Sequence, residues 1–263
     1  FGLSSWSILI PQALIGVASV ALLYATVKRA TTNAWAGLAA GLVLAMTPVA
    51  VLMFRFNNPD ALLVLLLIGA VYATERAIDN PRRALAWLAF GGALVGLAFL
   101  TKMMQAFLVL PALAIGYLIC AKVAWPKRIG HLLVAFGSMV IAAGWWVVLV
   151  ELWPKESRPY IGGSQNNSIL ELTLGYNGFG RLTGNEVGSV GGGGGWGTPG
   201  IGRLLSSEMG GQIAWFGPAA LVLLGFGLWL ARGRGRTDRA VAALVIWGGW
   251  LIVTGLTFSF MGG

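Results

Sequence analysis

Arg55-Phe56-Asn57-Asn58-Pro59-Asp60 stands between two apolar runs, residues 34–54 and 61–72, that contain no charged side chain. The runs predict membrane helices, and the polar stretch predicts the turn that joins them. Polar groups that face hydrocarbon without a partner are costly, so such a turn needs water or protein around it. This stretch, the polar turn, is therefore the first candidate for a functional site.

The composition is that of a protein with several membrane-spanning helices. Of the 263 residues, 57% are hydrophobic and 10% are charged, whereas soluble domains carry about 25% charged residues. Twelve tryptophans suit the aromatic belts at membrane interfaces. The single cysteine, Cys120, lies in an apolar run, so a disulfide framework is excluded.

Eight apolar segments have the length, or nearly the length, needed to cross about 30 Å of hydrocarbon. They are residues 7–27, 34–54, 60–76, 84–101, 103–121, 130–153, 212–231 and 240–258. The charge in Thr101-Lys102-Met103 favours a turn there over one long helix. The segments predict an all-α integral membrane bundle in three parts: helices in 1–153, a long loop in 154–211, and helices in 212–263.

The basic residues indicate which loops face the cytoplasm. Twelve of the 18 fall in alternate loops: Lys28, Arg29, Arg76, Arg82, Arg83, Lys122, Lys127, Arg128, Arg232, Arg234, Arg236 and Arg239. The positive-inside rule puts these loops in the cytoplasm, so both ends of the chain and the long loop are expected outside the plasma membrane. With only three acidic residues beside them, these loops account for the whole net charge of +9. That charge is a topology signal and does not indicate a nucleic-acid partner.

The long loop is the second candidate region. Residues 158–187 mix aromatic rings, amides and glycines, a composition that suits stacking on sugars and bonding to their hydroxyls. Nine of the fifteen residues 188–202 are glycines and predict a flexible tether or lid. Residues 203–211 predict a short interfacial helix. The glycine run 191–195 is not a phosphate-binding loop, because no Lys-Ser/Thr follows it.

The polar turn has a functional and a structural interpretation. The fork of Arg55 suits phosphate, and Arg55 and Lys102 together put two cations where an anionic lipid head group would sit. Each cation also suits a snorkelling membrane anchor. Asn58, Pro59 and Asp60 likewise make a good helix start, with an N-cap, a first-turn proline and a first-turn acid. The sequence leaves both interpretations open.

Eight other side chains are candidates for contacts with a sugar or an acceptor, or simply for folding the chain locally: Asn57, Asn58, Tyr160, Asn166, Asn167, Tyr176, Asn177 and Arg181. Glu151 is interpreted as a helix-end charge rather than a base, and the lone His131 as structural. No cluster of histidines, cysteines and carboxylates supports a metal site, and no cofactor is assigned.

Four motifs, in order, resemble the glycosyltransferase family 39 group. They are the polar turn before its apolar helix, Leu97-Ala98-Phe99-Leu100-Thr101-Lys102, the loop motifs at 160–164 and 175–184, and the closing residues 257–263. The loop motifs resemble actinobacterial members, and the closing residues resemble the approach to a later His-Pro-Tyr-Tyr segment. Members are polyprenyl-phosphate-sugar-dependent membrane transferases, related to protein O-mannosyltransferases and to the aminoarabinose transferase of lipid A.

The resemblance implies a GT-C fold with its active site on the extracytoplasmic face. It implies inverting transfer of a sugar from a polyprenyl-phosphate donor to a hydroxyl of a protein, lipid or glycan acceptor. Lys102 would hold the donor phosphate, with Arg55 nearby, and stabilise the charge on the departing group. Asp60 and Asn58 would orient the sugar or the cations.

The resemblance also predicts a missing group. The catalytic aspartate of the family lies in the first outer loop, which here would precede Phe1, and the base has to reach the acceptor hydroxyl. Since Phe1 is not an initiator methionine and Gly263 directly follows an apolar span, we expect a piece of a longer protein. Asp60 is the one candidate for a catalytic contribution within the piece.

Two rival functions are a transporter or flippase of lipid-linked sugars and a catalytically degenerate scaffold. A transporter would be expected to carry ionisable groups near the midplane and internal repeats. Here the charges cluster at the rims and no repeat is apparent. An aspartate in an upstream outer loop would favour the enzyme over both rivals.

The chain alone is expected to be inactive as a transferase, because it would hold the donor-phosphate half of the site without the base. The measurement is sugar transfer from a polyprenyl-phosphate donor by the purified 263-residue chain. Detectable transfer would contradict the expectation and place the base within these residues.

Overall fold

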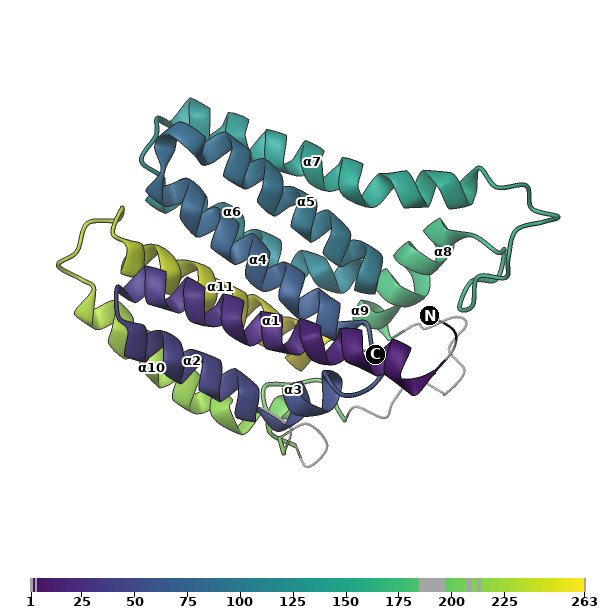
Figure 1. The fold of residues 1–263 in the computed structure, drawn as a ribbon, viewed down its shortest axis with the longest axis horizontal. Coiled ribbons are helices and arrows are strands. Elements are labelled where there is room, and N and C mark those ends of the chain that lie inside the picture. Colours follow the sequence, from purple (N-terminus) through teal and green to yellow (C-terminus); the bar gives the residue numbers. More distant parts are fainter. Residues whose placement is uncertain (1, 3, 185–196, 207–209, 212–213, 263) are drawn as a thin grey trace.

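A computed structural model describes residues 2, 4–184, 197–206, 210–211 and 214–262 (Figure 1). These residues form helices, turns and irregular segments, and they include no strand. The α-helices are α1 (Ser5–Thr31), α2 (Ala34–Met46), α3 (Pro48–Met53), α4 (Asp60–Asp79), α5 (Ala84–Lys102), α6 (Leu110–Cys120), α7 (Trp125–Glu151), α8 (Ile169–Leu174), α9 (Arg181–Thr183), α10 (Gly217–Leu230) and α11 (Arg239–Phe260). The short helical turns are η1 (Pro81–Arg83), η2 (Met103–Val109), η3 (Gly175–Gly180), η4 (Arg203–Leu205) and η5 (Ala214–Phe216).

Five helical segments are long and apolar enough to cross a membrane. They are Ser5–Thr31, Asp60–Asp79, Pro81–Cys120, Trp125–Glu151 and Arg239–Phe260. Ala34–Met46 and Ala214–Leu230 are shorter apolar helices. The predicted all-α integral membrane architecture is confirmed, and the count of eight crossings stays a prediction.

Two of the predicted spans are divided in the structure. Residues 34–54 form α2 and α3, with extended backbone at Thr47 between them. The residue before a proline disfavours helical backbone, and Pro48 has no N–H to continue the ladder. Residues 103–121 form η2 and then α6, and α5 ends at Lys102, where the sequence predicted a turn.

The helices run back and forth between two ends of the molecule. At one end, called the basic end, the chain turns between α1 and α2, α4 and α5, α6 and α7, and α10 and α11 (Figure 1). The opposite end, called the loop end, holds the polar turn, the junction of α5 with η2, and the segment that follows α7. The cationic loops chosen from the sequence therefore do lie together at one end.

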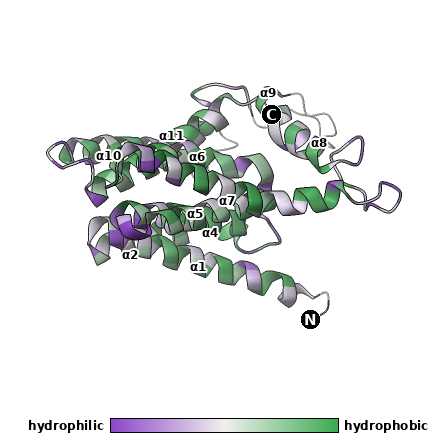
Figure 2. Cartoon of the chain, turned by 90° about the horizontal axis from the view of Figure 1, so that it is seen from above, coloured by the Kyte–Doolittle hydropathy of each residue, from purple (hydrophilic) through white to green (hydrophobic). Residues whose placement is uncertain are grey.

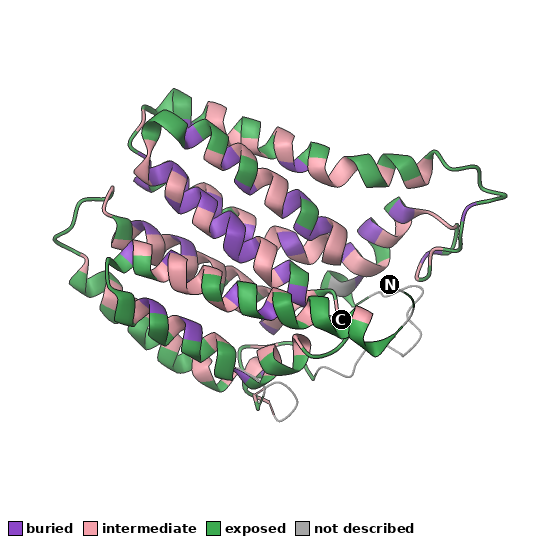
Figure 3. Cartoon of the chain, viewed as in Figure 1, coloured by how far each residue is buried: buried purple, intermediate pink, exposed green. Residues whose placement is uncertain are grey.

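Apolar surface covers the outside of this bundle. Figure 2 shows hydrophobic residues along most helices and hydrophilic ones gathered in the turns at the ends. Figure 3 shows the buried residues concentrated on α4 and its neighbours. Large side chains on the outer face of α7, such as Leu133, Phe136 and Ile141, are exposed, as expected for a helix that faces lipid.

Helix α4 is the centre of the bundle, and α5 lies between it and α7. Small residues allow both contacts: Gly91 faces Ala73 of α4, while Gly92 and Gly96 face the backbone of α7. A Cβ atom at Gly92 would collide with the carbonyl oxygen of Ala135. Such small-xxx-small spacing is a common basis for close helix packing in membranes, where apolar burial gives little driving force.

Polar contacts fasten the same helices. Ser138 Oγ on α7 donates to the carbonyl oxygen of Ala89 on α5 at 2.7 Å. At the basic end, Asp79 of α4 accepts from Arg29 of α1 at 2.7 Å and from Arg239 of α11 at 2.8 Å. The Asp79 side chain is only 4% exposed, so it joins the first, central and last long helices inside the protein.

Replacement of Gly92 by alanine is expected to destabilise the bundle by about 1–3 kcal/mol, because one methyl group forces α5 and α7 apart. Gly137→Ala on α7 is the matched control, since a Cβ atom there meets nothing within 4 Å. The control is expected to be neutral or stabilising by up to about 1 kcal/mol. Thermal unfolding in lipid nanodiscs measures both, and equal melting temperatures would contradict the assigned contact.

Candidate functional site

An ion pair at the loop end connects the two motifs singled out in the sequence. Lys102 Nζ lies 2.5 Å from Asp60 Oδ1, and the two side chains are 35% and 21% exposed. The pair links the first residue of α4 with the last residue of α5. A cation that is partly exposed and held by one carboxylate still has N–H donors for an anionic ligand.

The polar turn fixes the position of Asp60. Asn58 Oδ1 accepts from the backbone N–H of Asp60 at 2.6 Å, and Asn58 Nδ2 contacts the sulfur of Met53 at 3.0 Å. Gln12 Nε2 of α1 donates to the carbonyl oxygen of Asn58 at 3.2 Å. Asn58 thus folds the turn, but the residue that precedes α4 is Pro59, so Asn58 is not the N-cap that the sequence suggested. Asp60 lies in the first turn of α4 and also bonds to Lys102.

The backbone changes direction immediately after Lys102. Met103 has φ +46° and ψ −129°, an unfavourable region for a residue with a side chain. This conformation ends α5 and begins η2, so the lysine lies at the very end of its helix.

The segment after α7 reaches this junction through the same methionine. Thr173 Oγ1 of α8 and Asn177 Nδ2 of η3 contact the Met103 sulfur at 3.5 Å and 3.3 Å. Gly178 is buried, and a Cβ atom there would lie 3.4 Å from Met104. The long loop therefore packs directly against the residues that follow Lys102.

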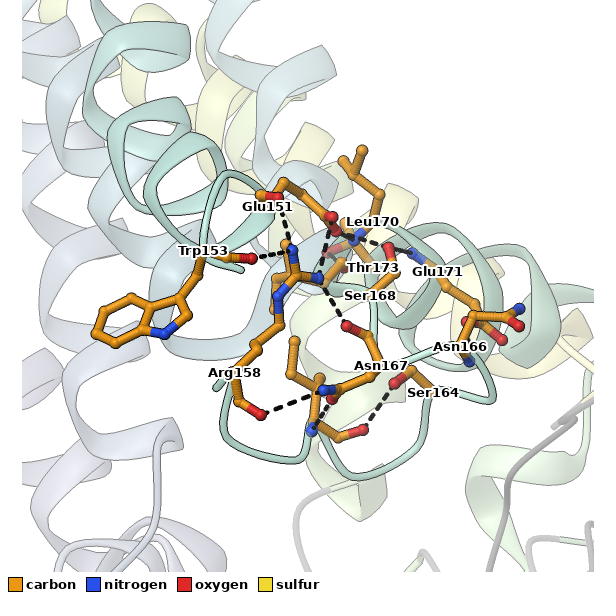
Figure 4. Close-up of polar contacts among 12 residues, drawn as sticks. Glu151, Trp153, Arg158, Ser164, Asn166, Asn167, Ser168, Leu170, Glu171 and Thr173 are labelled. Carbon is orange, nitrogen blue, oxygen red and sulfur yellow. Dashed lines mark hydrogen bonds and ion pairs between the residues drawn. The ribbon is translucent and has the colours of Figure 1, made fainter. Parts of the chain in front are cut away.

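A buried guanidinium organises the start of the long loop (Figure 4). Arg158 Nη1 donates to the carbonyl oxygen of Asn167 at 2.8 Å and pairs with Glu151 Oε2 at 3.3 Å. Its Nη2 donates to the carbonyl oxygens of Glu151 at 2.6 Å and Trp153 at 3.0 Å. Glu151 Oε1 also accepts from Ser168 Oγ at 2.6 Å. Glu151 is thus occupied in folding the loop, as the helix-end interpretation favoured.

A second carboxylate holds the next turn. Glu171 accepts from the backbone N–H of Asn166 and of Gln165, each at 2.8 Å. These bonds favour the ionised form and hold the pKa of Glu171 below its ordinary value. Asn167, in the left-handed region at φ +53°, accepts from the N–H of Ile161 through Oδ1 at 2.7 Å. Its side chain therefore shapes the loop.

The other predicted contacts are spread over the loop end. Arg55, Asn57 and Asn166 are exposed, as is Tyr160 at 78%. Within the described residues, the Arg55 side chain forms no hydrogen bond or ion pair, so no such contact joins it to Lys102. These residues stay candidates.

Of the two remaining candidates, the structure describes the side chain of Tyr176 but not that of Arg181. Tyr176 is half-buried and lies against Gly163. Arg181 begins α9, and its side chain lies outside the described part of the structure, like residues 185–196. The tether or lid predicted for residues 188–202 is described only from residue 197 onward. Within 203–211, the described residues give one short turn, η4.

Three residues that were not predicted from the sequence help to form the candidate site. Gln12 and Met103 contact the site through Asn58 and Asn177, and Arg158 anchors the loop. Gln12 could have been predicted, because an amide side chain inside an apolar run needs a polar partner within the membrane protein. Met103 gave no such signal, since its role follows from an unusual backbone angle. No metal-ligand group of three or more His, Cys, Asp or Glu occurs in the described residues.

Comparison with known families identifies the chain. The model of the dolichyl-phosphate-mannose-protein mannosyltransferase family matches residues 1–147. The chain belongs to this family. The matched part of this mannosyltransferase-family chain covers α1 to α6 and most of α7, including the pair of Asp60 and Lys102. The all-helical structure and its apolar helices agree with the GT-C type of membrane protein that the resemblance implied.

Two curated relatives from Bacillus subtilis (strain 168) match beyond that region. The chain is 47% identical to "Putative mannosyltransferase YycA" over 191 residues, which are 72% of this chain and 27% of the relative. It is 43% identical to "Putative mannosyltransferase YkcB" over 199 residues, 76% of this chain and 27% of the relative. The mannosyltransferase-family chain thus spans about a quarter of the length of these relatives. No solved structure matches it.

The loop turn held by Glu171 is expected to open in acid. The pKa of Glu171 is lower in the folded loop than in the unfolded chain, where it is about 4.3. Its contribution to loop stability is therefore fully present above the unfolded-state pKa and is lost as pH falls through the folded-state pKa. Hydrogen exchange at the amides of Gln165 and Asn166, corrected for the intrinsic effect of pH, should rise between about pH 6 and about pH 3. Glu171→Gln should abolish this change, and an unchanged pH response in the variant would refute the assignment.

Proposed function

We propose that this chain forms the donor-phosphate half of the active site of a membrane glycosyltransferase. The complete enzyme would move a sugar, mannose by analogy with the family, from a polyprenyl-phosphate donor to an acceptor hydroxyl. The ion pair of Lys102 with Asp60, at the loop end and against the long loop, is the observation that carries the proposal. The family match over the same residues supports it.

Lys102 is the group proposed to bind the donor phosphate. As a sugar leaves its lipid phosphate, negative charge grows on the phosphate oxygens, and a fixed ammonium group stabilises that charge. The Asp60 carboxylate at 2.5 Å keeps the ammonium at the end of α5 before the donor arrives. Arg55, exposed on the same polar turn, is the second proposed phosphate contact.

The acceptor hydroxyl needs a base, and Asp60 is the proposed contributor from this chain. Its carboxylate is partly exposed and lies beside the proposed phosphate contact. Because Lys102 already engages Asp60, we propose that the principal base lies outside these 263 residues, as the resemblance implies.

The long loop is the proposed contact surface for the sugar and the acceptor. Asn177 approaches the junction of α5 and η2 most directly, through Met103. Tyr160 and Asn166 offer an exposed ring and amide, while Asn57, Asn58, Asn167, Tyr176 and Arg181 are the other proposed contacts. The positive-inside rule supports an extracytoplasmic loop end in the plasma membrane, because the twelve loop cations gather at the opposite end.

Lys102→Ala in the full-length protein is expected to lower kcat/KM for a polyprenyl-phosphate-mannose donor by about 10²–10³-fold, because one fixed cation is lost at the departing phosphate. Lys102→Arg keeps the charge and should lose less. Transfer of radiolabelled mannose to the acceptor fraction of the membrane is the measurement.

The matched control is Lys155→Ala, which removes an exposed lysine from the same end of the molecule. Its transfer rate should stay close to that of the unchanged protein. Equal rates for Lys102→Ala and Lys155→Ala would remove the proposed phosphate contact.

A further inference from the structure

A small cavity lies at the basic end, at the opposite end of the bundle from the proposed active site. Its lining includes Arg29 of α1, Glu75 and Asp79 of α4, and Arg239 of α11. The space open to the centre of a water molecule is about 10 Å³, and roughly that volume is needed to hold one water. A phosphate or a lipid head group needs much more space than this.

Glu75 lines the cavity and has one acceptor atom that no described residue bonds. The residue is 5% exposed, and its Oε1 accepts from Trp247 Nε1 of α11 at 3.3 Å. Its Oε2 is buried and forms no hydrogen bond with any described residue. Buried polar atoms are nearly always bonded, so this oxygen calls for a partner.

Arg29 lines the same cavity and has one donor atom without an acceptor among the described residues. Its Nη2 donates to Asp79 at 2.7 Å, and Asp79 is held from the other side by Arg239. Its Nε is buried and, within the described residues, has no acceptor. The two residues that carry this acceptor and this donor, from two helices, therefore line a single cavity of water size.

We propose that this cavity is a binding site for one water molecule, which bridges Glu75 Oε2 and Arg29 Nε. The water oxygen accepts from the Arg29 N–H, and a water O–H donates to the carboxylate. If Glu75 carries a proton on Oε2, that O–H donates to the water instead, so both protein groups are bonded in either protonation state. The water adds a link between α1 and α4, and α4 is already joined to α11 by the bonds of Asp79 with Arg239 and of Glu75 with Trp247.

A density map of the full chain in lipid nanodiscs, at a resolution that shows ordered water, is the direct test. The expected result is a peak about 2.7–3.2 Å from both atoms. A direct bond between Glu75 and Arg29, an ion, or a dry cavity would each overturn the proposal.

Matched substitutions at Glu75 give an independent test. In a Trp247→Phe background, which removes the other partner of Glu75, we compare Glu75→Gln with Glu75→Met. Neither variant can carry a charge at this position, but only the glutamine can still bind the water and satisfy Arg29 through it. The methionine variant should melt about 2–6 °C below the glutamine variant. A methionine variant as stable as the glutamine variant, or more stable, would count against the water.

Discussion

The closeness of α5 to α7 is the constraint on which the rest of the structure depends. In hydrocarbon, helices gain little from burying apolar surface against each other, so they associate where backbones approach closely and polar groups find partners. Gly92 and Gly96 give that approach, and Ser138 adds a bond to the backbone of α5. On its other side, α5 packs against α4 at Gly91, and Lys102 at the end of α5 meets Asp60 at the start of α4.

The ion pairs at the two ends of the bundle differ in how deeply they are buried. At the basic end, Asp79 is almost fully buried between two arginines, so its carboxylate serves to hold helices together. At the loop end, the carboxylate of Asp60 holds a lysine that keeps a third of its side chain exposed. A buried, saturated pair is poorly suited to ligand exchange, whereas a partly exposed pair retains access for an anion.

The sequence predicted those features that follow from composition and from local signals. The apolar helices, the turn at Lys102 and the position of the cationic loops at one end could all be inferred, because they follow from the hydropathy and charge of successive residues. The bond between Lys102 and Asp60 could not, since the residues are 42 positions apart and their distance depends on how α4 and α5 pack. The loop was harder still, because Arg158 and Glu151 fold it through backbone carbonyls that no sequence pattern reveals.

Helix α11 runs without interruption from the basic end to the loop end. Its first residue, Arg239, bonds to Asp79, and just past its last turn Gly262 donates to the carbonyl oxygen of Leu182 in α9 at 3.0 Å. At 22 residues, the helix is about 33 Å long, close to the hydrocarbon thickness of a bilayer. The separation between the contact of Arg239 with Asp79 and α9 in the long loop is therefore a fixed length, set by the geometry of the helix. The helix therefore holds α9 at a constant distance from the basic end of the bundle.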